Sequence, residues 1–127
     1  AGFPGLVVQI FNKNKAFHVK LYEKSPVKRR FLIGAINELS LNAEVLGDVR
    51  DEVIDSEIII CRAFKKLKQI IQVSREIAKK PHKLMILKGQ NAQEEIKNSL
   101  KTKKYPYKLE SSMTNKDSKI ILMEIDK

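Results

Sequence analysis

Four short stretches of the chain carry residues that could bind a small ligand. They are AGFPG at residues 1–5, Glu23 after FHVKLY, VRDE at residues 49–52 and CRAF at residues 61–64. A glycine pair ahead of a helix is a weak signal of a cofactor loop, since GxxG often arises there by chance. AGFPG therefore has two interpretations at this point: an ordinary helix start, or part of a cofactor-binding loop.

Glu23 is an acidic residue at the end of an expected strand that follows this glycine loop. A carboxylate there can accept hydrogen bonds from both ribose hydroxyls of an adenosine cofactor, because its two oxygens match the spacing of the diol. The other interpretation is a solvated carboxylate that pairs with Lys24 or Lys28. From the residue alone, both interpretations stay open.

The hydropathy pattern predicts helices and strands in alternation, with caps at the expected boundaries. Phe17, Val19 and Leu21 alternate with polar residues as in a strand, Ser25 and Pro26 are typical of a helix start, and Pro81 ends a later helix. We expect helices at residues 6–11, 26–39, 63–79 and 92–100. We expect strands at residues 16–23, 43–48, 57–62, 83–89, 104–111 and 118–126.

This order predicts an α/β domain spanning residues 1–127, with a mainly parallel sheet, helices on both faces and a closing antiparallel pair. In such sheets ligands bind at the carboxyl ends of the strands, where three of the four stretches lie. Two helices have apolar stripes that we expect to face the core. Their residues are Val27, Phe31, Ala35 and Leu39 in the first, and Phe64, Leu67, Ile70, Ile71, Ser74, Ile77 and Ala78 in the second.

The chain is strongly basic, with 25 Lys and Arg against 15 Asp and Glu and a net charge of +10. This balance favours an anionic partner such as nucleic acid or an acidic membrane surface, although solubility alone could also account for it. No apolar run is long enough to span a membrane, so we expect a cytoplasmic protein. The single cysteine, Cys61, cannot form an internal disulfide, and His18 and His82 lack the neighbouring ligands that a metal site needs.

Six motifs occur in order along the chain: AGFPG, LYEKSPVKRRFL, VRDE, CRAF, ILKGQ with EEI behind it, and SKIILMEI. Together they resemble the GidB family of bacterial small-subunit ribosomal RNA methyltransferases. The resemblance covers essentially the whole chain, and several motifs in the right order are more specific than any one of them. It implies a class I methyltransferase fold, which is a Rossmann-like sheet, and S-adenosylmethionine as cofactor. It also implies formation of 7-methylguanosine in 16S ribosomal RNA of the small subunit by a monomer.

The resemblance also assigns roles to residues in the four stretches. It implies that Gly2 and Phe3 belong to the cofactor loop and that Glu23 faces the ribose. Asp51 and Glu52 would lie beside the adenine. Arg62 would approach the methionine end of the cofactor or the RNA. Cys61 stands where the family commonly has serine, so we interpret it as a small residue at a strand end rather than a nucleophile.

Basic residues are the candidates for holding the RNA. They are Lys28, Arg29, Arg30 and Lys88, with Lys24, Lys65, Lys66 and Lys68 nearby in the sequence. A charge run is more often a solvated face than a binding site, and a surface turn accounts for Lys88 equally well. Nitrogen 7 of guanine has an in-plane lone pair and no proton, so its attack on a sulfonium methyl needs no general base. We therefore expect no catalytic acid or base, and catalysis that rests on positioning.

The chain departs from the family pattern ahead of AGFPG. The family loop begins with a strand, an acidic residue and two further glycines, and members carry an N-terminal helical region; none of these precedes AGFPG in this sequence. We expect the absent strand to belong between the strands that end at Glu23 and Arg62, which would leave each with an unpaired edge. Three hypotheses follow: a methyltransferase or its C-terminal part, a non-catalytic RNA-binding module, or an inactive remnant of a split gene.

Overall fold

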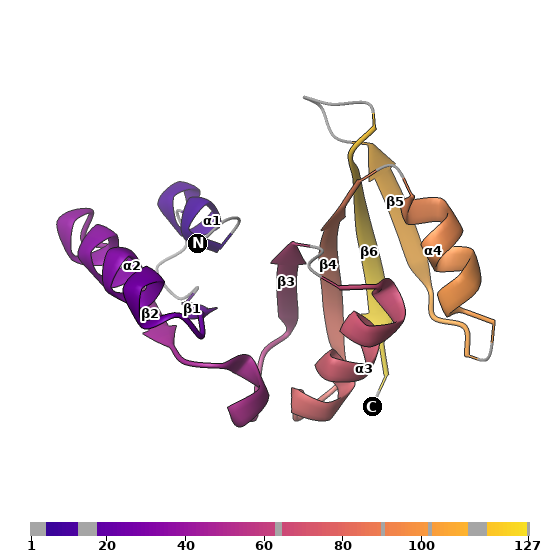
Figure 1. Ribbon diagram of the computed structural model, residues 1–127, viewed down its shortest axis with the longest axis horizontal. Helices are drawn as coiled ribbons and strands as arrows, with labels where there is room; N and C mark the ends of the chain where they lie inside the picture. Colours follow the sequence, from indigo (N-terminus) through magenta and orange to yellow (C-terminus); the bar gives the residue numbers. More distant parts are fainter. Residues whose placement is uncertain are drawn as a thin grey trace. The chain divides into compact units, whose positions relative to one another are not determined.

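The computed structural model describes residues 5–12, 18–62, 65–89, 91–101, 103–111 and 117–126. Helices and strands alternate along these residues, much as the sequence predicts (Figure 1). The chain divides into two compact units, 1–52 and 53–127. The assignment of both units to one domain stays a prediction.

The first unit contains α1 (Gly5–Phe11), β1 (Val19–Tyr22), α2 (Pro26–Glu38), β2 (Ala43–Leu46) and a short 3-10 helix, η1 (Val49–Asp51). β1 and β2 pair in parallel, with Val19 opposite Ala43 and Tyr22 opposite Leu46. α1 contacts β1, and α2 contacts β2. A Cβ atom on Gly5 would collide with the side chain of Leu21. The second glycine of AGFPG therefore lets α1 pack closely on β1.

Local sequence signals define both ends of α2. The Ser25 hydroxyl accepts a hydrogen bond from the Lys28 backbone N–H at 3.4 Å, and Pro26 occupies the first helical position. At the other end Ser40 adopts a positive φ of 51°. The N–H of Leu41 donates to the carbonyl of Ile36 at 3.0 Å, and the N–H of Ser40 donates to that of Asn37 at 3.3 Å. This pair of bonds is the Schellman motif, which satisfies the last carbonyls of a helix.

The predicted core-facing stripe of α2 is wrong. Phe31 is 66% exposed, and Val27 and Leu39 are exposed too, whereas Leu32 is 1% exposed and packs with Leu21 and Ile36. The helix carries two adjacent apolar rows, and spacing by four residues fits both. Contact with the two strands buries the row of Leu32 and Ile36, which the periodicity alone could not select.

The second unit contains β3 (Ile58–Arg62), α3 (Leu67–Ile77), β4 (His82–Lys88), α4 (Ala92–Ser99), β5 (Tyr107–Ser111) and β6 (Lys119–Ile125). Its sheet has the order β3-β4-β6-β5. β3 and β4 are parallel, whereas β6 runs antiparallel to both β4 and β5. The predicted antiparallel closing pair is thus confirmed.

α3 and α4 lie over the same face of this sheet (Figure 1). The apolar stripe predicted for α3 is confirmed by the buried side chains of Leu67, Ile70, Ile71, Ser74, Ile77 and Ala78; Phe64 lies outside the described residues. The Ser74 hydroxyl donates to the Ile71 carbonyl at 2.9 Å, which satisfies the one polar group of the stripe. Ile96 of α4 is buried in the same core, as expected.

The strands that end before Glu23 and at Arg62 belong to different sheets. Within the described parts of the chain, β1 pairs only with β2 and β3 pairs only with β4. Each of these two strands therefore has one edge without a partner strand, as the sequence predicts. No helix in the described ranges is both long and apolar enough to cross a membrane.

Candidate functional site

In the first unit, parallel pairing brings the carboxyl ends of β1 and β2 to one edge. The backbone N–H of Glu23, the residue after β1, donates to the carbonyl of Leu46, the last residue of β2, at 3.1 Å, so the two strands are joined at this end. The segments that follow the strands begin at this edge. They carry Glu23 on one side and the run from Gly47 to Glu52 on the other. This edge is where a parallel sheet presents ligand-binding side chains.

Glu23 also organises the turn into α2. Its carboxylate oxygen Oε1 accepts a hydrogen bond from the Ser25 backbone N–H at 3.1 Å. The Arg29 guanidinium donates from Nη1 to the carbonyls of Glu23 and Lys24, at 2.9 and 2.8 Å. The backbone at Glu23 is therefore held on two sides. A carboxylate has about four lone-pair sites, so the bond to Ser25 still allows further donors to approach.

The segment after β2 is shaped by Asp48. Its side chain caps η1 by accepting from the Arg50 N–H at 3.0 Å, and it also binds the Arg50 guanidinium, with Nη2 to Oδ2 at 3.0 Å. The hydrogen bonds from Arg50 hold the pKa of the Asp48 carboxyl below its usual value. Asp51 and Glu52, which follow, are exposed. The cap thus fixes the loop and leaves the next two carboxylates accessible to a ligand.

Tyr22, the last residue of β1, lies opposite Leu46 at the end of β2. Partial burial raises the pKa of its phenol, and the nearby charges of Glu52 and Glu44 raise it further. Glu52 is therefore close enough to β1 to influence its last residue electrostatically. The structure brings Glu23 and Glu52 to the same edge, whereas Gly2 and Phe3 lie outside the described residues.

In the second unit, Arg62 ends β3 and Lys88 ends the adjacent strand β4. Arg62 is exposed and lies opposite Leu87 in the register. The Lys88 side chain is only 9% exposed; its Nζ lies 2.6 Å from Glu95 Oε2 and donates to the Lys65 carbonyl at 3.1 Å. Lys88 thereby ties β4 to α4 and to the residues before α3. Its predicted contact with RNA stays a prediction, and this buried ion pair gives it a structural role.

The basic cluster on α2 divides by role. Lys28 and Arg30 are exposed, whereas Arg29 is engaged with the two backbone carbonyls already described. Sequence reasoning grouped the three as RNA-binding residues and so missed the positioning role of Arg29. It also missed Tyr22, although the place of Tyr22 beside Glu23 at a strand end was a usable signal.

Cys61 and the two histidines differ in their environments: His82 is buried, with Nδ1 3.1 Å from the Lys80 carbonyl and with no hydrogen-bond partner for Nε2 among the described residues. Burial raises the pKa of the Cys61 thiol to about 11, although the Lys88 charge opposes the shift. The thiol is therefore protonated at neutral pH, which agrees with a small residue rather than a nucleophile. His18 lies 3.0 Å from Asn42 Oδ1 and 3.4 Å from Glu44 Oε2. The described residues include no group of three His, Cys, Asp or Glu side chains that could hold a metal ion.

Comparisons with solved structures identify the fold. A methyltransferase from Geobacter sulfurreducens superposes with a TM-score of 0.61 and 9% identity, over 85% of this chain and 58% of that one. M. jannaschii TYW2, solved in complex with AdoMet, superposes with a TM-score of 0.55 and 18% identity, over 84% of this chain and 56% of that one. The arrangement of strands and helices is a class I methyltransferase fold, as the sequence predicts.

Comparisons with known sequences identify the family. A ribosomal RNA small subunit methyltransferase G from Pelagibacter ubique is 31% identical over 121 residues, which is 92% of this chain and 57% of that protein. One from Mesoplasma florum is 36% identical over 125 residues, covering 92% of this chain and 50% of that protein. The chain thus spans about half the length of these relatives. The profile of the GidB family, described as rRNA small subunit methyltransferase G, matches residues 1–121. The chain therefore belongs to the GidB family.

Proposed function

We propose that this chain belongs to an S-adenosylmethionine-dependent methyltransferase that modifies nitrogen 7 of a guanine in 16S ribosomal RNA. Family membership supports the reaction class, and the bound AdoMet of the structural neighbour TYW2 supports the cofactor. The observation that carries the proposal is the shared edge of β1 and β2, where Glu23 and Glu52 follow adjacent strands. We further propose that residues 1–127 form one domain, because the family match runs through both units.

The residues of this edge fit an adenosine group. Glu23 would accept hydrogen bonds from the ribose hydroxyls. Its hydrogen bond from the Ser25 N–H and the bond from Arg29 to its carbonyl fix the backbone at this position. Asp51 and Glu52 are exposed carboxylates that can accept from the adenine amino group. Gly2 and Phe3 would complete the loop, and Arg62 would face the methionine end or the RNA. Lys28 and Arg30 are exposed cations suited to RNA phosphates.

Methyl transfer to nitrogen 7 of guanine requires no acid or base from the side chains. When bound, the cofactor would supply a methyl group on a positively charged sulfur; its transfer to the unprotonated lone pair of guanine nitrogen 7 would break the sulfur–methyl bond and release S-adenosylhomocysteine. No residue of the chain needs to remove a proton. The contribution of the protein is to hold the two reacting atoms in line, an effect worth roughly 7–11 kcal/mol when the geometry is good. We propose that the protein acts as a monomer on the small subunit or its RNA, in the cytoplasm.

The test is cofactor binding by the protein that carries this chain, measured by calorimetry. In Glu52→Ala, we expect the Kd for S-adenosylmethionine to rise about tenfold, the value of one hydrogen bond to a charged acceptor. Glu38→Ala removes an equally exposed carboxylate from the last turn of α2 and should leave the Kd unchanged. Equal Kd values for Glu52→Ala and the unmodified protein would contradict the proposed site.

The reaction has its own measurement. The protein is incubated with small ribosomal subunits and labelled cofactor, and the 16S RNA is digested to nucleosides. We expect 7-methylguanosine by mass spectrometry. Label in another nucleoside, or in the large-subunit RNA of a parallel incubation with large subunits, would overturn the proposed substrate while leaving the cofactor site standing.

A further inference from the structure

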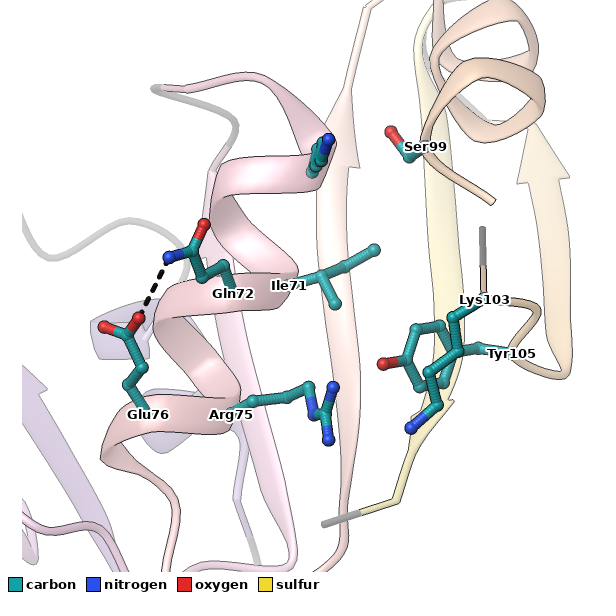
Figure 2. A pocket seen from close by; sticks show the side chains of 8 residues that line it. Ile71, Gln72, Arg75, Glu76, Ser99, Lys103 and Tyr105 are labelled. Carbon is teal, nitrogen blue, oxygen red and sulfur yellow. Dashed lines mark hydrogen bonds between the residues drawn. The ribbon is translucent and has the colours of Figure 1, made fainter. Parts of the chain in front are cut away.

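A pocket of about 440 Å³ opens in the second unit between α3 and the segment that follows α4 (Figure 2). One wall is a single face of α3 that carries Lys68 and the residues three, four, seven and eight positions after it, Ile71, Gln72, Arg75 and Glu76. The facing wall carries Ser99, Lys103 and Tyr105. None of these residues except Lys68 was a candidate for function in the sequence.

The pocket lies toward the sheet edge opposite to the carboxyl ends of β3 and β4. α3 runs back from the end of β3, and Arg75 lies in its last turn, a few residues before β4 begins. Tyr105 just precedes β5, and the Pro106 carbonyl accepts from the N–H of Glu124 at 2.9 Å, near the end of β6. The pocket is therefore a different place in this unit from the strand ends that carry Arg62 and Lys88.

Arg75 is the cation with unused hydrogen-bonding capacity. Its guanidinium reaches across from α3 toward Tyr105 (Figure 2). Its Nε is shielded from solvent and has no hydrogen-bond partner within the part of the chain that the structure describes. Because Nε is shielded, an anion in the pocket would bind the other N–H groups of this guanidinium, whose side chain lines the pocket. A phosphate suits this role, because the guanidinium fork can bind two of its oxygens.

The charge of the pocket is positive but partly compensated. Lys103 Nζ lies 3.0 Å from Asp126 Oδ1 and 5.2 Å from the centre of the Tyr105 ring. Hydrogen bonding to Lys103 and the charges of Lys103 and Arg75 lower the pKa of Asp126, which is therefore ionised at neutral pH. Glu76 accepts from Gln72 Nε2 at 3.0 Å. Three cations thus face two carboxylates, which leaves room for one further negative charge.

We infer that this pocket binds a phosphate of the RNA backbone, as a second RNA contact away from the strand ends. The inference rests on the proposed function, since it takes RNA as the substrate. A polymer of phosphates is favoured over a free ion because the segment that supplies Lys103 carries two further exposed cations, Lys101 and Lys104, and because the whole chain has a charge of +10. The pocket then positions the RNA without touching the reacting base.

The experiment measures binding of a fluorescein-labelled 16S RNA fragment to the protein that carries this chain, by fluorescence anisotropy at several salt concentrations. Lys68→Gln and Arg75→Gln should each raise the Kd about three- to tenfold and reduce the salt slope by about one. Asp126→Asn should have the opposite sign and lower the Kd about threefold, because it removes a carboxylate that repels phosphate. Lys108→Gln is the control: it removes an exposed cation from β5 outside the pocket and should change the Kd less than twofold.

The outcomes separate the pocket from general charge. Equal Kd changes in Arg75→Gln and Lys108→Gln, or no tightening in Asp126→Asn, would overturn the inference. Lys68→Gln and Asp126→Asn alter exposed side chains, so they decide the matter if Arg75→Gln fails to fold. The resonance of the Arg75 Nε–H should shift on addition of the RNA fragment. A shift with inorganic phosphate but not with RNA would assign the pocket to a free anion and overturn the RNA contact.

The same variants keep this inference separate from the proposed function. Arg75→Gln should leave the Kd for S-adenosylmethionine unchanged, since the pocket does not include the carboxylates after β1 and β2. If Glu52→Ala binds the cofactor normally while Arg75→Gln loses RNA affinity, the proposed cofactor site fails and the pocket stands. If cofactor binding behaves as expected and the RNA affinity does not change, only the pocket fails.

Discussion

The two units of this chain reach the same kinds of secondary structure with very different amounts of core. In the second unit, a cluster of twelve buried residues joins α3 and α4 to β4 and β6, and partly buried residues of β3 and β5 pack against it. In the first unit, the corresponding cluster has three buried residues, Leu21, Leu32 and Ile36, over two strands. A sheet generally needs three or more strands with an apolar face for independent stability. We therefore expect the second unit to hold most of the free energy of unfolding.

Exposed apolar side chains follow the same division. Seven of the ten large hydrophobic side chains that are exposed among the described residues belong to the first unit: Val7, Ile10, Phe11, Val27, Phe31, Ile33 and Leu39. Yet this unit has a well-capped helix, with Ser25 at its start and a Schellman motif at its end. The comparison shows that local signals can specify a helix and its ends where tertiary burial supplies little.

The largest expected effect contrasts one core residue of the second unit with one exposed residue of the first. Leu84 of β4 is buried in the large cluster, so Leu84→Ala should lower the free energy of unfolding by about 3 kcal/mol. Phe31→Ala removes a larger side chain from the exposed face of α2 and should change stability by less than about 0.5 kcal/mol. Denaturant unfolding, followed by hydrogen exchange in each unit, measures both.

Leu32→Ala provides the matched control on the same helix, because Leu32 is buried next to the exposed Phe31. It should destabilise the first unit clearly more than Phe31→Ala does. If Phe31→Ala proved as costly as Leu32→Ala, the contrast in burial between the two rows of α2 would be wrong.

The next effect concerns Cys61, whose reactivity reports how well β3 is covered in the second unit. Raising the thiol pKa from 9.0 to about 11 lowers the thiolate fraction near pH 8 about a hundredfold. Alkylation of Cys61 should therefore be about a hundredfold slower than that of the unfolded chain, and it should speed up as the pH rises toward 11. The rate of iodoacetamide labelling, followed by mass spectrometry, gives this ratio.

A cysteine in the first unit sharpens the comparison. Gly47 has no atom within 4 Å of the position of a Cβ, so Gly47→Cys in a Cys61→Ser background introduces a thiol without steric conflict. This thiol should react at nearly the rate of the unfolded chain. Equal protection of the two thiols would mean that the loop after β2 is as well covered as β3, against the contrast drawn above.

The sequence predicted the order and type of the helices and strands well, because the residues that mark their ends act on the local backbone. Ser25, Pro26 and Pro81 mark helix ends, and the wide apolar face of α3 fits only one orientation. α2 was different, since the longer apolar row of Val27, Phe31, Ala35 and Leu39 predicts the wrong face, and only contact with β1 and β2 selects Leu32 and Ile36. Periodicity predicts that a helix is amphipathic, but the choice between adjacent faces is made by tertiary packing.

The candidate site shows the same limit. Its place at the strand ends followed from the general rule for parallel sheets. The positioning bonds of Arg29, the ion pair of Lys88 with Glu95 and the pocket at Arg75 could not be predicted. The ion pair and the pocket join residues on different helices or strands. The bonds of Arg29 depend on how the chain turns between β1 and α2, and the pattern of residue types does not record that turn.

The smallest expected effect is a local gain in the weaker unit. Ser40 sits in the left-handed region with φ of 51°, a conformation that costs a residue with a Cβ about 1 kcal/mol and costs glycine almost nothing. Ser40→Gly keeps both Schellman hydrogen bonds and should stabilise the first unit by about 0.5–1 kcal/mol. Ser40→Ala is the matched control, because it removes the hydroxyl but keeps the Cβ, and it should bring no gain. Slower hydrogen exchange of the α2 amides in Ser40→Gly alone would show that the first unit is limited by local backbone conformation as well as by its small core. An equal gain in Ser40→Ala would instead trace the cost to the hydroxyl group.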